Sequence, residues 1–358
     1  MDVVNPKRFA SVDALRGITV AAMLLVNNPG DWGHVYAPLL HAEWHGCTPT
    51  DLVFPFFLFV VGVSIALGIV PRLEGGADPT PLRRAILVRA AKIVGLGLLL
   101  NLLSYYSFDR EWFRPWGVLQ RIGLCFAAAG LLATLAKARA QWLVAAALLF
   151  GYWALLAWGG SYERHVNLAN RVDVALLGPL VYKYDAATGL GYEPEGLLST
   201  LPAIATVLLG VRAGEWLRRD GTMRLLSAGV VALLLGAAWA RVFPLNKNLW
   251  TSSFVLWTAG WAMLALASCH LLVDRWRWPA LGRRFGVNAI AAYAGSGALL
   301  CVLVALGAWE TIYRVGFAGW MAPLFGPYVA SLAFAAAYVL FWWGVVWLMD
   351  RRGWYLKI

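Results

Sequence analysis

Residues 51–70 read DLVFPFFLFVVGVSIALGIV, a run whose only charged residue is the first, Asp51. A helix needs about 20 apolar residues to cross about 30 Å of hydrocarbon, so this run is long enough to span a bilayer. Pro55 and Gly62 would weaken a helix in water, but lipid-embedded helices tolerate them because neighbouring helices repack around them. The stretch therefore predicts a transmembrane helix.

Comparable runs recur along the whole chain, of which 61% is hydrophobic and only 14% charged. Soluble domains carry about 25% charged residues, so this composition predicts a membrane protein. About ten runs have spanning length: 10–28, 51–70, 84–105, 115–136, 140–159, 197–217, 223–243, 250–273, 286–307 and 325–349. We see no internal repeat and no long linker. We therefore expect an all-α fold, a polytopic transmembrane helical bundle of about ten spans that forms a single domain over residues 1–358.

The formal net charge of +11 follows from 30 Lys and Arg against 19 Asp and Glu. Most of these basic residues lie in alternate connections between the apolar runs, which is the pattern of the positive-inside rule. The rule predicts that both termini are cytoplasmic and that the segments 29–50 and 160–195 lie outside. Because topology accounts for the charge, no nucleic acid partner is expected.

The outer segment after the first span is the densest polar stretch of the chain. It holds Asn27 and three histidines, His34, His41 and His45, and it ends at Asp51, which could cap the second helix at its positive end. A neutral imidazole can take a proton from an amine or hydroxyl at working pH, so this cluster favours a reaction centre. His41 and His45 lack a third ligand nearby, and the four cysteines have no paired spacing. We expect no metal site.

Several of these stretches together resemble the heparan-α-glucosaminide N-acetyltransferase family, which comprises a lysosomal membrane enzyme and bacterial relatives. The stretches that carry the resemblance are LRG at 15–17, VN at 26–27, HAEWHG at 41–46, TDLVFP at 50–55, GVLQR at 117–121, PEGLL at 194–198, PLNKNLW at 244–250 and GVNA at 286–289. They run in order over nearly the whole chain.

The resemblance implies transfer of an acetyl group from cytosolic acetyl-CoA to the amine of a glucosamine-type amino sugar across the membrane. It places the family's active histidine at His41 and its asparagine partner at Asn27. It also implies a multi-pass protein of the bacterial inner membrane with the acceptor on the periplasmic side. The family's lysosomal member has a large luminal region that this sequence does not contain, so we expect a smaller amino sugar or cell-wall fragment as acceptor.

The remaining site residues are hypotheses from charge and position. Basic residues at the predicted cytoplasmic face would meet the phosphates of acetyl-CoA: Arg72, Arg84 and Arg89. Polar residues at the outer side would line the acceptor pocket: Asp51, Arg121, Glu195, Asn246, Lys247 and Asn248. Arg121 lies one to two turns inside a predicted span and should point into the bundle.

Three alternatives stay open at this point. His41 could act as a general base or as a nucleophile that briefly holds the acetyl group. The residues at 246–248 could instead form a hydrogen-bonded clasp between loops. The protein could also be a transporter that moves an amino sugar or another small molecule without chemistry, although a visible repeat, which many transporters have, is missing. A homodimer is compatible with the sequence.

Overall fold

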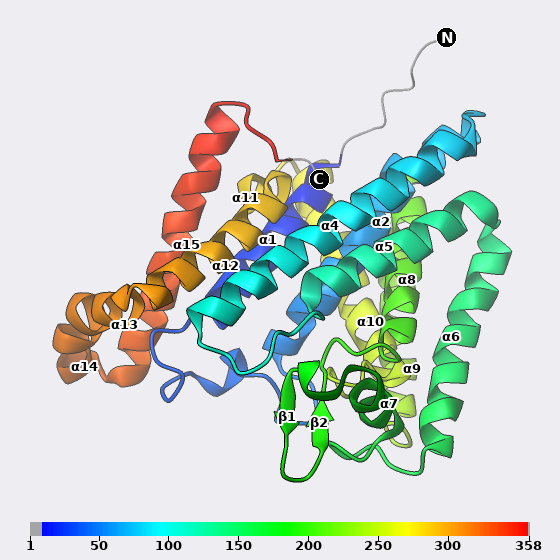
Figure 1. The fold of residues 1–358 in the computed structure, drawn as a ribbon. Helices are drawn as coiled ribbons and strands as arrows, with labels where there is room; N and C mark the ends of the chain where they lie inside the picture. The colour runs from blue at the N-terminus through cyan, green and yellow to red at the C-terminus, as the bar shows by residue number, and fades with distance from the viewer. Residues whose placement is uncertain (1–8, 357–358) are drawn as a thin grey trace.

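The computed structural model describes residues 9–356 and consists mainly of helices (Figure 1). The helices are, in chain order, α1 (Ala10–Asn27), α2 (Val53–Gly68), α3 (Val70–Glu74), α4 (Pro79–Ser107), α5 (Val118–Leu135), α6 (Ala138–Trp158), α7 (Leu168–Leu177), α8 (Thr200–Arg218), α9 (Thr222–Trp239), α10 (Ser252–Cys269), α11 (Arg283–Val287), α12 (Ala289–Ala305), α13 (Ala308–Tyr313), α14 (Gly319–Phe325) and α15 (Pro327–Arg351). Two short strands, β1 (Lys183–Asp185) and β2 (Leu190–Tyr192), form an antiparallel hairpin in which Lys183 lies opposite Tyr192. The predicted all-α bundle is confirmed.

Eight of the helical segments within residues 9–356 are long and apolar enough to cross a membrane. A ninth span results if α12 is counted together with α13–α14, from which it is separated by a 94° bend. The predicted span 197–217 corresponds to α8, which is long enough but carries Arg212, Glu215 and Arg218. Arg212 is nevertheless buried, because it bonds to Gln141 on α6 at 2.7 Å and to Glu215 at 2.8 Å.

Two glycines let α2 and α8 meet at the centre of the bundle. A Cβ on Gly62 would lie 2.0 Å from the carbonyl oxygen of Val207, and one on Gly210 would lie 2.1 Å from that of Phe59. Only glycine allows backbones to approach so closely, as is common between membrane helices. The largest cluster of buried hydrophobic side chains surrounds this contact and also includes residues of α1, α5 and α10.

The two ends of the bundle differ in structure. The long connections 28–52, 108–117, 159–199 and 240–251, with α7 and the hairpin, gather at the lower end in Figure 1, which we call the loop end. Short turns join the helices at the opposite end, which we call the basic end because Arg72, Arg84, Arg218 and Arg275 lie there. α1 begins and α15 ends at the basic end, as two termini on one side of a membrane require.

The segment 308–324, which connects the predicted spans 286–307 and 325–349, is itself helical. Gly307 takes a left-handed conformation (φ 64°) that ends α12, and the chain then folds into α13, a π-helical turn at Arg314–Ala318 and α14. Rings of Trp309, Tyr313 and Phe317 pack around Phe334 of α15 with centroids 4.8 to 5.6 Å apart. This aromatic packing, which depends on the distant helix α15, holds the segment in a helical form.

Candidate active site

A cavity of about 430 Å³ opens at the loop end between α1, α2, α5 and α12. Six of the predicted site residues line it: Asn27, His41, Asp51, Glu195, Lys247 and Asn248. Three aromatic residues, Trp44, Tyr182 and Tyr192, and the guanidinium-bearing Arg114 also contribute to its wall. The structure thus brings together side chains that are more than 200 residues apart in the chain.

His41 is oriented by Asp51, whose carboxylate Oδ1 lies 2.7 Å from the ring Nδ1. The other oxygen, Oδ2, accepts hydrogen bonds from the backbone N–H groups of Ala42 and Thr48, each at 3.0 Å. Thr48 and Asp51 form a capping box at the short 3-10 helix Pro49–Leu52 that leads into α2, with Thr48 as the N-cap and Asp51 at the third position. Asp51 therefore caps this short helix rather than α2, which was the expectation from the sequence, because α2 itself begins without a side-chain cap. Because a carboxylate accepts hydrogen bonds, the proton of a neutral His41 lies on Nδ1, and Nε2 keeps its lone pair.

Burial differs sharply within this pair. The Asp51 side chain is 1% exposed, whereas that of His41 is 45% exposed. A buried, hydrogen-bonded carboxylate behind a partly exposed imidazole is the arrangement that activates histidine in acyl-transfer enzymes.

Lys247 is the next charged group at this histidine. Its Nζ lies 3.2 Å from Nδ1 and 3.1 Å from Nε2 of His41, and 4.0 Å from Oδ1 of Asp51. Burial lowers the pKa of Lys247, and the carboxylates of Asp51 and Glu195 only partly compensate.

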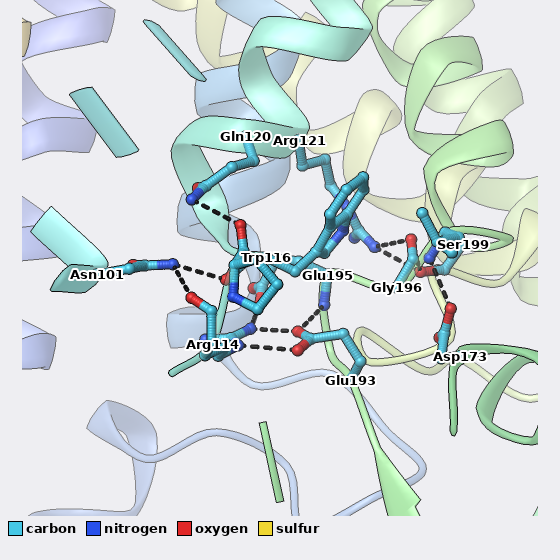
Figure 2. Close-up of polar contacts among 12 residues, drawn as sticks. Asn101, Arg114, Trp116, Gln120, Arg121, Asp173, Glu193, Glu195, Gly196 and Ser199 are labelled. Carbon is cyan, nitrogen blue, oxygen red and sulfur yellow. Dashed lines mark hydrogen bonds and ion pairs between the residues drawn. The ribbon is translucent and has the colours of Figure 1, made fainter. Parts of the chain in front are cut away.

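Glu195 belongs to an ion cluster in the wall of the cavity (Figure 2). Arg114 donates from Nε to Glu193 at 2.8 Å and from Nη2 to Glu195 at 2.5 Å. Burial disfavours the charge of Arg114, but the two carboxylates outweigh it and raise the pKa of the arginine. Burial raises the pKa of Glu193. Burial also disfavours the charge of Glu195, but the positive charges of Arg114, Arg121 and Lys247 outweigh this effect and lower its pKa.

Arg114 and Glu193 were not among the residues expected from the sequence. Arg114 lies between the predicted spans 84–105 and 115–136, and Glu193 lies two positions before Glu195, which was expected. The closeness of Glu193 to Glu195 was the one available signal, because a pair separated by 79 residues carries no local pattern.

Arg121 lies behind the cavity rather than in its wall. Its side chain is fully buried, as expected for a charge inside a span, and Nη2 donates to the carbonyl of Gly196 at 3.1 Å and to the hydroxyl of Ser199 (Figure 2). The guanidinium also stands 5.2 Å from the ring centroid of Trp250. These contacts hold the segment that carries Glu195, so Arg121 supports the wall.

The motif at 246–248 divides between two roles. Asn246 is buried and joins loops: its amide contacts Nδ1 of His45 at 3.3 Å, and its Oδ1 accepts from the backbone N–H of Leu249 at 2.9 Å. Lys247 and Asn248 face the cavity instead. The structure thus shows the clasp for Asn246, whereas a contact of Lys247 and Asn248 with an acceptor stays a prediction.

The remaining expected residues lie at the two ends of the bundle. Asn27 is exposed at the last turn of α1, where it lines the cavity. Arg72, Arg84 and Arg89 are exposed on α3 and α4 towards the basic end, where the Arg89 guanidinium stands 5.2 Å from the ring centroid of Phe126. None of these three arginines lines the cavity.

Comparison with known proteins places this site in a family. Residues 8–238 match the family model described as heparan-alpha-glucosaminide N-acetyltransferase, catalytic. Two curated relatives, both named heparan-alpha-glucosaminide N-acetyltransferase, are 29% (Homo sapiens) and 28% (Mus musculus) identical over 355 aligned positions, which cover 81% of this chain and 53% of each relative. The chain thus spans about half the length of the curated relatives it matches. Since the family model covers more than half of the chain and includes Asn27, His41, Asp51, Arg121 and Glu195, the protein belongs to the heparan-alpha-glucosaminide N-acetyltransferase family.

Proposed function

We propose that the protein is a multi-pass acetyltransferase of the bacterial inner membrane, which moves the acetyl group of acetyl-CoA to the amine of a glucosamine-type amino sugar on the periplasmic side. The observation that carries the proposal is the His41–Asp51 pair at the cavity, at 2.7 Å, in a chain of an N-acetyltransferase family. Both curated relatives are named as N-acetyltransferases, which favours acetyl transfer over transport of an unchanged sugar.

His41 is the centre of the proposed mechanism. With its Nδ1 proton bonded to Asp51, the imidazole presents Nε2 either to the acceptor amine, as a base, or to the acetyl carbon, as a nucleophile. The amide of Asn27 would donate to the developing oxyanion, a contribution of about 3–4 kcal/mol for one such donor. In both routes an amide C–N bond forms, the thioester C–S bond breaks, and one proton is released for each acceptor that enters as an ammonium ion.

The cavity wall supports an amino-sugar acceptor. Trp44, Tyr182 and Tyr192 line the cavity and would pack against the apolar side of a pyranose ring, while Asn248 and Glu195 would hydrogen-bond with its hydroxyls and amine. Acetyl-CoA would approach from the basic end, where Arg72, Arg84 and Arg89 are exposed to its phosphates.

The test is acetyl transfer by the purified protein in detergent, with radiolabelled acetyl-CoA and a panel of amino sugars. We expect labelled N-acetyl product from wild type and a loss of at least about 100-fold in kcat for His41→Ala, because proton transfer or nucleophilic attack at Nε2 disappears.

The matched control is His34→Ala, since His34 has the same kind of carboxylate partner, Asp31 at 2.7 Å, but does not line the cavity. It should keep wild-type turnover. Wild-type turnover in His41→Ala would refute the assignment of the histidine. Uptake of unmodified sugar into proteoliposomes, without any acetylated product, would favour the transporter instead.

A further inference from the structure

Lys247 is a partly buried cation at the proposed reaction centre, with its side chain 19% exposed and its Nζ against His41. It follows Asn246, which is hydrogen-bonded within its own loop and to His45 of the loop before α2, so the backbone at the start of the Lys247 side chain is held in place. Its Nζ reaches His41 more closely than it reaches any carboxylate, with Asp51 at 4.0 Å. The ammonium group of Lys247 therefore lies closer to the imidazole of His41 than to the carboxylate of Asp51.

The two distances to the ring define the position of the ammonium group. Nζ is nearly equidistant from Nδ1 (3.2 Å) and Nε2 (3.1 Å) of His41. In the ring plane, a point at these distances would collide with the carbon between the two nitrogens, so Nζ lies over the ring face. There its N–H bonds do not align with the Nε2 lone pair, and they remain available to an atom bound above the imidazole.

The charged groups around Lys247 come from three further segments. Asp51 precedes α2, Glu195 lies in the segment before α8, and Arg121 projects from α5, while the thiol of Cys47 is also close. Burial and Arg121 favour the neutral amine, and Asp51 and Glu195 favour the ammonium ion. Because its pKa is lowered, the ammonium group of Lys247 is a stronger acid than that of a solvated lysine and gives up a proton more readily.

We propose that Lys247 is the acid that protonates the departing sulfur of the acetyl donor. The inference rests on the proposed acetyl transfer. As the C–S bond breaks, its electron pair goes to sulfur, and Nζ transfers one proton to it, which yields the free thiol and a neutral amine on Lys247. The neutral Nζ then regains the proton that the acceptor nitrogen loses on forming the amide, directly where His41 is the nucleophile and from protonated His41 where His41 is the base, so the lysine returns to its ammonium form. His41 thus acts on the acceptor amine or on the acetyl carbon, and Lys247 protonates the sulfur of the leaving group.

The experiment varies the leaving group. Acetyl-CoA releases an alkyl thiolate, whereas p-nitrothiophenyl acetate releases an aryl thiolate of lower basicity that departs without protonation. For Lys247→Gln we expect a loss of about 100-fold with acetyl-CoA and of less than about tenfold with the aryl thioester. Lys183→Gln, on the exposed hairpin strand β1, should behave as wild type with both donors.

Lys247→Arg separates charge from proton donation, because arginine keeps the positive charge but does not give up its proton in proteins. We expect the same selective loss with acetyl-CoA. Full acetyl-CoA activity in Lys247→Arg, or equal losses with both donors in Lys247→Gln, would overturn the proposal, the second result indicating a structural role. Failure of wild type to acetylate any amino sugar from either donor would instead refute the proposed function itself.

Discussion

At the scale of single residues, Asp51 connects helix formation to chemistry. One carboxylate oxygen accepts the N–H groups of Ala42 and Thr48, and the other orients His41 at 2.7 Å. The same residue that starts the helical turn before α2 therefore fixes which nitrogen of the imidazole is free. This link explains how a histidine in a loop acquires a defined tautomer.

Asp51→Asn should separate these two roles. The amide oxygen can still accept the backbone N–H groups, but the amide nitrogen would then donate to Nδ1 of His41 and shift the ring proton to Nε2. We expect kcat to fall by about 10²- to 10⁴-fold with a nearly unchanged melting temperature. Asp31→Asn, which alters the His34 pair outside the cavity, is the matched control. An Asp51→Asn protein with wild-type kcat would show that the tautomer does not matter.

At the scale of elements, α7 supports the wall of the cavity through a single carboxylate. Oδ1 of Asp173 accepts the backbone N–H of Leu197 at 2.8 Å, close to Gly196, which Arg121 holds from the other side (Figure 2). Oδ2 of Asp173 is buried and has no hydrogen-bond partner among residues 9–356. Burial raises the pKa of Asp173 to about 7, with Glu193 adding to the shift.

A raised carboxyl pKa makes stability depend on pH. The folded protein holds the Asp173 proton up to about pH 7, whereas the unfolded chain loses it near the ordinary aspartate pKa of 3.8, so the free energy of unfolding should fall as pH rises between these values. Asp173→Asn keeps the acceptor for Leu197 and removes the charge. The free energy of unfolding of Asp173→Asn, measured from melting curves in detergent, should match that of wild type near pH 4 and exceed it at pH 8 by roughly 1–4 kcal/mol. Asp109→Asn, at an exposed position, should show no such gain, and a parallel pH dependence of wild type and Asp173→Asn would contradict the account.

How far the sequence predicts these elements depends on the range of the interactions. Apolar runs predict the spans because crossing lipid imposes a length, and a local polar cluster predicts Asn27, His41 and Asp51 because these residues share one outer segment. The ion pair of Arg114 with Glu193 and the contact of Lys247 with His41 span 79 and 206 residues, so only the tertiary fold brings them together. The helical form of 308–324 likewise depends on packing against Phe334.

At the scale of the whole molecule, the bundle is polarised. The cavity lies at the loop end, while Arg72, Arg84, Arg218 and Arg275 lie at the ends of helices at the basic end. Cytoplasmic connections of membrane proteins carry the excess of Lys and Arg. A donor from the cytoplasm and an acceptor from the periplasm would therefore meet only within the bundle, at the end where His41 lies.

Cysteine labelling tests this orientation with two matched substitutions. Ala187→Cys places a thiol in the exposed turn of the hairpin at the loop end, and Ala77→Cys places one in the exposed turn before α4 at the basic end. Native thiols should contribute little background, because Cys125 and Cys301 are buried, Cys269 is half-buried, and burial raises the pKa of Cys47 to about 12. In intact spheroplasts an impermeant maleimide should label Ala187→Cys but should label Ala77→Cys only after permeabilisation. The reverse pattern would place the cavity on the cytoplasmic side, where acetyl-CoA and acceptor would meet without crossing the membrane. Transfer across the membrane would then be refuted, even if His41 catalyses acetyl transfer.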